Sequence, residues 1–211
     1  TIDAVVPGGM ALSTRHIVVI EGHPDRAGGH FFHALATAYE RGARGAGHDV
    51  DGIEVAALDL PFISSREDHA TGAVPGPIRQ AQLTILRADH LVLIHPIWNG
   101  GAPARLRAFM EQVFRPGFTF PDAKVGQKLK FSAAFTERKG LADKSARVIT
   151  TMQMPALVYR WYFRPHQEAS ALRLGGASPV RETPIGLVDS SDGPSRERWL
   201  KDVEHLGAQG L

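Results

Sequence analysis

The sequence predicts an α/β fold, a three-layer sandwich in which helices cover both faces of a parallel sheet of five strands. Short apolar runs alternate with stretches of helical periodicity along the 211 residues, which is the pattern of repeated βα units. The first and third runs, Ile17–Ile20 and Leu91–Ile94, are apolar throughout, as is typical of central strands covered on both faces. The second run, Val50–Leu58, contains Asp51 and Glu54 and is therefore predicted at an edge of the sheet.

The remaining elements follow from the same periodicity. Further strands are predicted at Ala146–Thr150 and Val180–Val188, and helices at Phe31–Gly45, Pro77–Ala88, Ala104–Phe114 and Ser195–Leu206, the last with Ser195 as its N-cap. Residues 1–15 lack periodicity and are predicted to be an N-terminal tail or extension before one domain, 16–211, in which 121–144 form an irregular excursion. The predicted strand order is 2-1-3-4-5, because strand one must be central if its loop is to neighbour those after strands three and four.

The composition favours a small-molecule partner. Hydrophobic residues make up 43% of the chain and charged residues 22%, as is usual for soluble globular proteins. Because 24 Lys and Arg face 22 Asp and Glu and are dispersed, nucleic acid is not an expected partner. The absence of cysteine excludes disulfides, thiolate nucleophiles and Cys-ligated metal sites. No apolar run is long enough for a membrane span and no signal peptide is recognised, so a cytoplasmic location is expected.

The loop after the first strand has the features of an anion site. Glycines precede the predicted start of a helix at Phe31, where unpaired backbone amides and the helix dipole favour a phosphate. The amides of Gly29, His30 and Phe31 are expected at the phosphate, and His23, Arg26 and His30 add positive charge. The loop matches neither a Walker A motif nor the dinucleotide fingerprint, and the alternative is an ordinary βα turn.

The segment His95–Pro103 joins the third strand to a helix, where open α/β sheets bind ligands. A Trp and two glycines bounded by prolines supply a flat apolar surface and accessible amides, which suit a planar heteroaromatic ring. The ring is expected to contact five consecutive residues, Pro96, Ile97, Trp98, Asn99 and Gly100. The alternative is that the Trp only caps the core.

The loop after the fourth strand completes the predicted cofactor site. Thr150, Thr151, Met152 and Gln153 lie at the same edge of the sheet as the two earlier loops, and their hydroxyl, amide and side-chain polar groups suit the polar edge of a ring. Together the three loops predict a planar cofactor with a phosphate tail.

Two further residues are candidates for catalysis. Tyr159 and His166, in an aromatic and basic run, form a pair that can stabilise charge or relay a proton, the alternative being that they are core or interface residues. No metal site is expected, because His30 and His33 form the only close histidine pair and no carboxylate continues a ligand pattern. A Gly-x-Ser-x-Gly elbow is absent, which excludes an α/β-hydrolase nucleophile.

Four segments resemble the flavodoxin-like NAD(P)H:quinone oxidoreductase family, which includes modulator of drug activity proteins and ancillary flavoproteins of potassium efflux. They are the first loop and helix (Ile20–Asp25 with His33–Leu35), the ring loop Pro96–Ala104, the helix and exit Phe109–Phe120, and the fourth strand with its loop, Lys144–Met152. Asn99 stands where the family often has an aromatic residue.

The resemblance implies a flavodoxin-like sandwich that binds FMN or FAD, takes electrons from NAD(P)H and passes two of them to a quinone, azo or nitro acceptor in a ping-pong scheme. It also implies a homodimer that completes the pocket, and places Tyr159 and His166 at the flavin. Two alternatives stay open: a flavin-binding regulatory subunit of a transporter with weak turnover, and a one-electron carrier of the flavodoxin type.

Overall fold

The computed structural model describes residues 13–27, 29–118, 140–162 and 167–211. Five parallel strands form one sheet in the order β2-β1-β3-β4-β5, which confirms the predicted topology. The strands are β1 (His16–Glu21), β2 (Asp49–Glu54), β3 (His90–Pro96), β4 (Ser145–Thr151) and β5 (Val180–Ile185). The apolar strands β1 and β3 lie inside the sheet and the charged β2 at its edge, as predicted.

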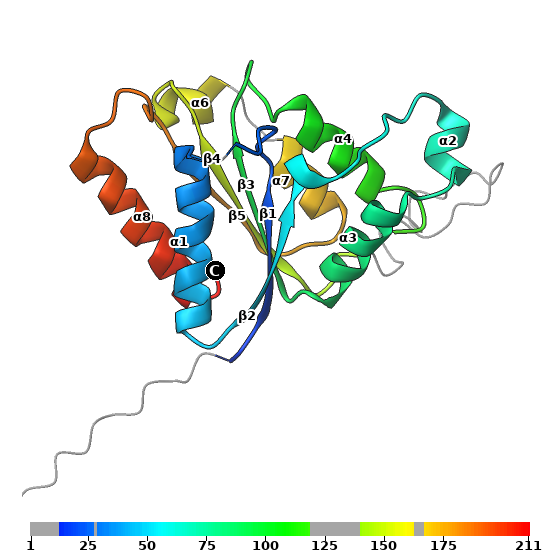
Figure 1. Ribbon diagram of the computed structural model, residues 1–211, viewed down its shortest axis with the longest axis horizontal. Coiled ribbons are helices and arrows are strands. Elements are labelled where there is room, and N and C mark those ends of the chain that lie inside the picture. Colours follow the sequence, from blue (N-terminus) through cyan, green and yellow to red (C-terminus); the bar gives the residue numbers. More distant parts are fainter. Residues whose placement is uncertain (1–12, 28, 119–139, 163–166) are drawn as a thin grey trace, which may run out of the picture.

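Helices cover both faces of the sheet (Figure 1). On one face lie α1 (Phe31–Gly45) and α8 (Gly193–Ala208); on the other lie α3 (Gly76–Arg87), α4 (Ala104–Val113) and α7 (Gln167–Leu174). The two faces have separate cores because side chains of a strand alternate: Ile17 and Val19 pack beneath α1, whereas Val18 and Ile20 pack beneath α3 and α4. Two short helices, α2 (Arg66–Thr71) and α6 (Ala156–Tyr162), complete the described elements.

Several boundaries differ from the prediction for local reasons. β2 ends at Glu54 and continues as a 3₁₀ turn, Val55–Ala57, whose carbonyls accept hydrogen bonds from Arg105. β5 ends at Ile185, opposite the last residue of β4, and Leu187 then turns with φ 58°. Both runs are apolar beyond their strands, so periodicity alone overestimates their lengths.

The N-cap assigned to Ser195 is wrong. Asp192 caps α8, and its side-chain oxygen accepts a hydrogen bond from the amide of Ser195 at 2.9 Å. The helix therefore begins two residues earlier than predicted, with Pro194 in its first turn, where a missing amide hydrogen is tolerated.

The predicted tail and excursion fall largely outside the described residues, which omit 1–12 and 119–139. Arg15, the last residue of the predicted tail, donates a hydrogen bond to the carbonyl of Gly210 at 2.9 Å. Among the described residues, no helix is both long and apolar enough to cross a membrane.

Candidate functional site

A tight turn at the carboxyl end of β3 forms the centre of the site. The amide of Trp98 donates to the carbonyl of Gly101 at 2.8 Å, and the amide of Gly101 donates back to Trp98 at 3.0 Å. Asn99 (φ 50°) and Gly100 (φ 82°) occupy the two central positions with left-handed backbone. Asn-Gly is the preferred pair for this type I′ turn, since both positions require positive φ. The asparagine is thus explained by backbone geometry.

The loop after β1 approaches β3 closely. The amide of Gly22 donates to the carbonyl of Ile94 at 2.8 Å, and a Cβ atom at this position would lie 2.5 Å from Leu106. Glycine therefore allows this close approach, whereas a larger residue would require the end of the Leu106 side chain on α4 to shift.

Asp25 organises the rest of this loop. Its carboxylate accepts hydrogen bonds from the amide of Ala27 (2.8 Å) and from Nε2 of His30 (2.9 Å), and these two interactions, the amide first, lower the pKa of Asp25. His23 stacks on Phe32 at 4.3 Å between ring centroids. Burial, followed by the nearby His30, lowers the pKa of His23, so at neutral pH His23 is an uncharged donor or acceptor.

The start of α1 supplies unpaired donors. His30 is the N-cap residue but its side chain makes no capping hydrogen bond, since its ring is directed to Asp25 instead. The first amides of a helix have no partner within the helix, and here no capping side chain replaces one. An anion at this end of the helix is therefore favoured by both hydrogen bonding and the helix dipole.

These loops enclose a cavity of about 870 Å³, which we name the α1 cavity. All but two of the residues predicted to bind the cofactor line it: His23, Gly29, His30, Phe31, Pro96, Ile97, Trp98, Asn99, Gly100, Thr151, Met152 and Gln153. The three loops predicted to act together thus do lie around one space.

The other two predicted cofactor residues lie elsewhere. Thr150 is buried within β4, opposite His95 of β3, and does not line the cavity. Arg26 lies exposed in the loop after β1 and is also not among the lining residues.

The loop after β5 also lines the α1 cavity, through Val188 and Asp189, and so does Arg196 near the start of α8. The guanidinium of Arg196 lies 5.6 Å from the ring centroid of Phe31 and donates to the carbonyl of Val188 at 3.1 Å. Asp189 accepts a hydrogen bond from the side chain of Gln153 at 2.5 Å. The loop after β5 was not predicted to take part in the site, although it follows a strand at the same edge of the sheet.

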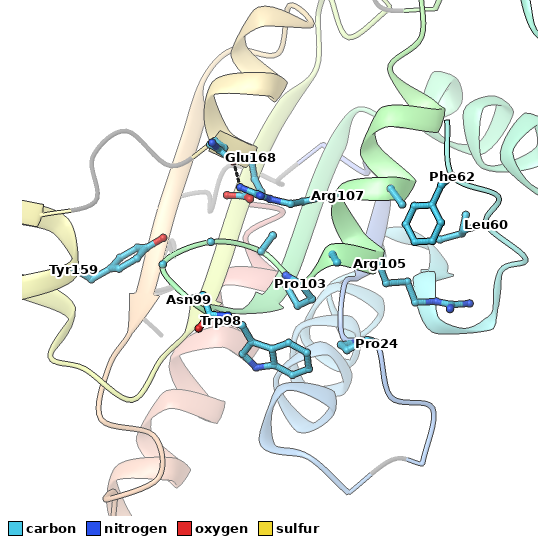
Figure 2. A pocket seen from close by; sticks show the side chains of 16 residues that line it. Pro24, Leu60, Phe62, Trp98, Asn99, Pro103, Arg105, Arg107, Tyr159 and Glu168 are labelled. Carbon is cyan, nitrogen blue, oxygen red and sulfur yellow. Dashed lines mark hydrogen bonds between the residues drawn. The ribbon is translucent and has the colours of Figure 1, made fainter. Parts of the chain in front are cut away.

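A second cavity of about 860 Å³, the α4 cavity, lies against the start of α4 and shares Trp98, Asn99 and Gly100 with the first (Figure 2). The turn is therefore a common wall. Leu60 and Phe62 lie at one end of the α4 cavity and Tyr159 at the other.

Tyr159 lines the α4 cavity and does not line the α1 cavity. It comes from α6, is only 1% exposed, and its pKa is raised to about 12 by burial and by the charges of Glu168 and Glu182. Its hydroxyl consequently stays protonated at physiological pH. His166, the other predicted catalytic residue, lies outside the described residues.

Metal ligands are not grouped in the described part of the chain, where no three His, Cys, Asp or Glu side chains are placed to hold an ion.

Comparison with known proteins agrees with this architecture. A model of the flavodoxin-like fold family matches residues 15–198. The chain belongs to this family. Its flavodoxin-like sheet carries the site at the carboxyl ends of β1, β3 and β4.

Two curated relatives match only part of the chain and at low sequence identity. An uncharacterized NAD(P)H oxidoreductase of Haemophilus influenzae is 28% identical over 106 residues, which are 49% of this chain and 52% of that protein. An FMN-dependent NADH:quinone oxidoreductase of Alteromonas mediterranea is 26% identical over 110 residues, 44% of this chain and 54% of that protein. The matches thus span about half the length of these curated relatives.

Among solved structures, an NAD(P)H:quinone oxidoreductase from Methanothermobacter marburgensis superposes with a TM-score of 0.73, covering 93% of this chain and 96% of that one. Its sequence is 19% identical, so the likeness concerns the fold.

Proposed function

We propose that this flavodoxin-like protein is an FMN-dependent NAD(P)H oxidoreductase that passes two electrons to a quinone or a similar acceptor. The observation that carries the proposal is the α1 cavity, which is lined both by an uncapped helix start and by the Trp98 turn. The names of the two curated relatives support it.

The residues present fit FMN on three points. The unpaired amides at the start of α1, with His23 and His30, suit the phosphate. The backbone of the Trp98 turn and the indole ring suit the flat apolar face of the isoalloxazine. Thr151, Met152 and Gln153 present polar groups to the edge of a ring. The phosphate and the ring of FMN together match these three groups of residues, and none of them is left to bind the adenine that FAD carries. We therefore propose FMN in preference to FAD.

FMN, when bound, supplies the hydride chemistry, accepting electrons from NAD(P)H and giving them to the acceptor in alternate half-reactions. The chain positions FMN and supplies the hydrogen-bond donors around it. The Trp98 turn fixes the ring, the α1 amides hold the phosphate, and the neutral hydroxyl of Tyr159 is a hydrogen-bond donor for negative charge that develops beside the common wall. His166 remains the proposed partner of Tyr159.

We further propose that the protein acts as a homodimer. On α6 most described side chains are exposed around one buried residue: Tyr159 is buried, whereas Leu157 is 77% and Trp161 84% exposed. Val158 and Phe62 are also exposed. Exposed large apolar side chains beside a ligand cavity are typical of an interface that completes a site.

The proposal is tested by adding FMN to the purified protein and following flavin fluorescence, then measuring NADH and NADPH oxidation with a series of quinones. We expect dissociation constants in the micromolar range or below, and parallel lines in double-reciprocal plots. Failure to bind FMN would refute the proposal. Full FMN loading with negligible NAD(P)H oxidation would favour a regulatory subunit instead.

A further inference from the structure

Three histidine side chains gather beside the start of α1. The ring centroids of His23 and His30 lie 4.6 Å apart, and that of His33 lies 6.1 Å from each of them. His23 and His30 line the α1 cavity, whereas the ring of His33 is paired with Glu21, its Nδ1 lying 2.8 Å from a carboxylate oxygen. An imidazole can be a neutral or a charged donor, and its contacts decide which.

His23 is fixed as a neutral donor. Its Nδ1 accepts a hydrogen bond from the amide of Asp25 at 3.1 Å, so the proton of the neutral ring is on Nε2. The ring stacks on Phe32 and meets Trp98 edge-on, with 5.7 Å between the latter pair of ring centroids. A second proton would have to enter at Nδ1, against the amide hydrogen of Asp25, and burial lowers the pKa of the ring. His23 therefore offers a hydrogen bond without a positive charge.

His30 has different neighbours. Its Nε2 lies 2.9 Å from the carboxylate of Asp25, which only accepts, so Nε2 carries a proton. The amide of Ala27 and then His30 lower the pKa of Asp25, which is therefore ionised at neutral pH. Because Nε2 is engaged, a phosphate oxygen can contact this ring only at Nδ1, and a dianionic phosphate also only accepts. An imidazole between two such acceptors carries a proton on both nitrogens and is an imidazolium.

We infer that the α1 cavity binds a phosphate dianion between His23 and His30 with uptake of one proton from solvent, which enters His30 at Nδ1. His23 then contributes a neutral hydrogen bond and His30 a charge-assisted one. In the proposed oxidoreductase the phosphate is that of FMN, and this use rests on the proposed function, whereas phosphate binding itself does not. Affinity should rise as the pH falls, because the complex holds a proton that the free protein does not hold.

Other charged groups around the cavity do not account for such a proton. The guanidinium of Arg196 is held by the carbonyl of Val188 and lies over the ring of Phe31. Asp189 accepts a hydrogen bond from Gln153. Arginine and aspartate side chains do not ordinarily titrate near neutral pH, so these groups change the attraction for a phosphate without taking up a proton.

Titration calorimetry at pH 7, in phosphate-free buffers of different ionisation enthalpy, measures the proton, because proton uptake makes the observed heat depend on the buffer. FMN is mostly a dianion at this pH, and we expect its binding to take up about half to one proton. Riboflavin, which lacks the phosphate, should take up none. The affinity for FMN should fall by up to about tenfold from pH 7 to pH 8, and that for riboflavin should stay constant.

Four variants assign the proton. His30→Asn should weaken FMN binding about tenfold or more and abolish proton uptake, without changing riboflavin binding. His30→Arg, a permanent cation, should restore much of the FMN affinity without proton uptake, which a merely structural role of His30 would not produce. His33→Asn and the matched control His205→Asn, an exposed histidine of α8, should both keep the uptake. Because His30 is itself exposed, its variants are expected to fold.

Heats that are equal in all buffers, equal proton uptake with riboflavin, or full uptake in His30→Asn would each overturn the inference and leave FMN binding, and with it the proposed function, intact. If FMN does not bind, the proposed function fails, and inorganic phosphate tests the inference on the flavin-free chain. Nitrogen NMR at pH 7 should then show both ring nitrogens of His30 protonated in phosphate but not in chloride of equal ionic strength. An unchanged His30 spectrum in phosphate would overturn the inference as well.

Discussion

The two cavities share the Trp98 turn but are built from different parts of the chain. The α1 cavity is lined by loops that directly follow β1, β3, β4 and β5, so the hydrogen bonds of the sheet fix their starting points. The α4 cavity also uses the loop after β3 and Pro24 of the loop after β1, but the rest of its lining comes from α4, α6 and α7 and from the segment after β2. Its shape depends more on how helices pack, and its polar groups include the buried carboxylate Glu168.

This difference suggests a division of roles. Backbone amides at strand ends hold one shape and suit a resident cofactor, since they are positioned before the ligand arrives. Helix side chains beside exposed aromatic residues suit a ligand that enters and leaves. The turn between the cavities is where the two ligands would meet.

Gly100→Val should have the largest effect, because it acts on the wall that both cavities share. Gly100 has φ 82°, a conformation that a β-branched residue adopts only at a cost of about 1–3 kcal/mol. We expect FMN affinity to fall about a hundredfold. Asn99→Gly, which also accepts positive φ, is the matched control and should be nearly neutral. Unchanged FMN affinity in folded Gly100→Val would show that the turn does not shape the flavin site.

Trp98→Ala should reduce FMN affinity by about thirtyfold, since stacking of a ring on an aromatic side chain contributes about 2 kcal/mol. The side chain is 50% exposed, and the temperature of unfolding without FMN should change little. Fluorescence titration measures the affinity and calorimetry the stability. Unchanged affinity would remove the indole from the flavin site.

The sequence was sufficient to predict the sheet and most of the α1 cavity. Strand order follows from short apolar runs and the position of Asp51 and Glu54, and the bounds of α1 are those predicted. The cavity was predictable because its residues directly follow strands, so that knowing the sheet order is enough to bring them together. Asn99 also carried a readable signal, since Asn-Gly between turn-forming residues indicates a type I′ turn.

The α4 cavity was not predictable in the same way. Phe62, Arg107 and Glu168 are far apart in the sequence, and which of their side chains meet depends on helix packing. The separation of Tyr159 from the cavity of the predicted cofactor residues has the same cause: it lies on α6, a helix that the sequence analysis interpreted only as an aromatic run. Local patterns specify loops next to strands better than they specify helix faces.

Tyr159→Phe should separate the cavities kinetically. Loss of the hydroxyl should lower turnover with a quinone about tenfold, the effect of removing one hydrogen-bond donor from developing charge, with less than about a twofold change in FMN affinity. Because the pKa of Tyr159 is about 12, its hydroxyl should cause no loss of activity as the pH rises from 7 to 10. Stopped-flow measurement of the two half-reactions is the test. An equal fall in FMN affinity would place Tyr159 at the α1 cavity instead.

The smallest expected effect concerns the opposite edge of the sheet, and it limits how pH profiles of either cavity are interpreted. His90, at the start of β3, is 2% exposed, and its pKa is lowered from 6.5 to about 3 by burial and then by Arg15, Arg147 and Arg181. The unfolded chain therefore takes up a proton below pH 6.5 that the folded chain does not take up until about pH 3, so stability falls as the pH is lowered through this range. Between pH 7 and 5.5 we expect a loss of about 1 kcal/mol from this residue. Urea denaturation at the two pH values measures it, and His90→Gln should remove most of the difference. If the stability of His90→Gln keeps the full pH dependence, other groups cause that dependence. If the dependence is lost, part of any fall in ligand binding by the wild-type chain near pH 5.5 is due to the lower stability of the fold and not to a change in the cavities.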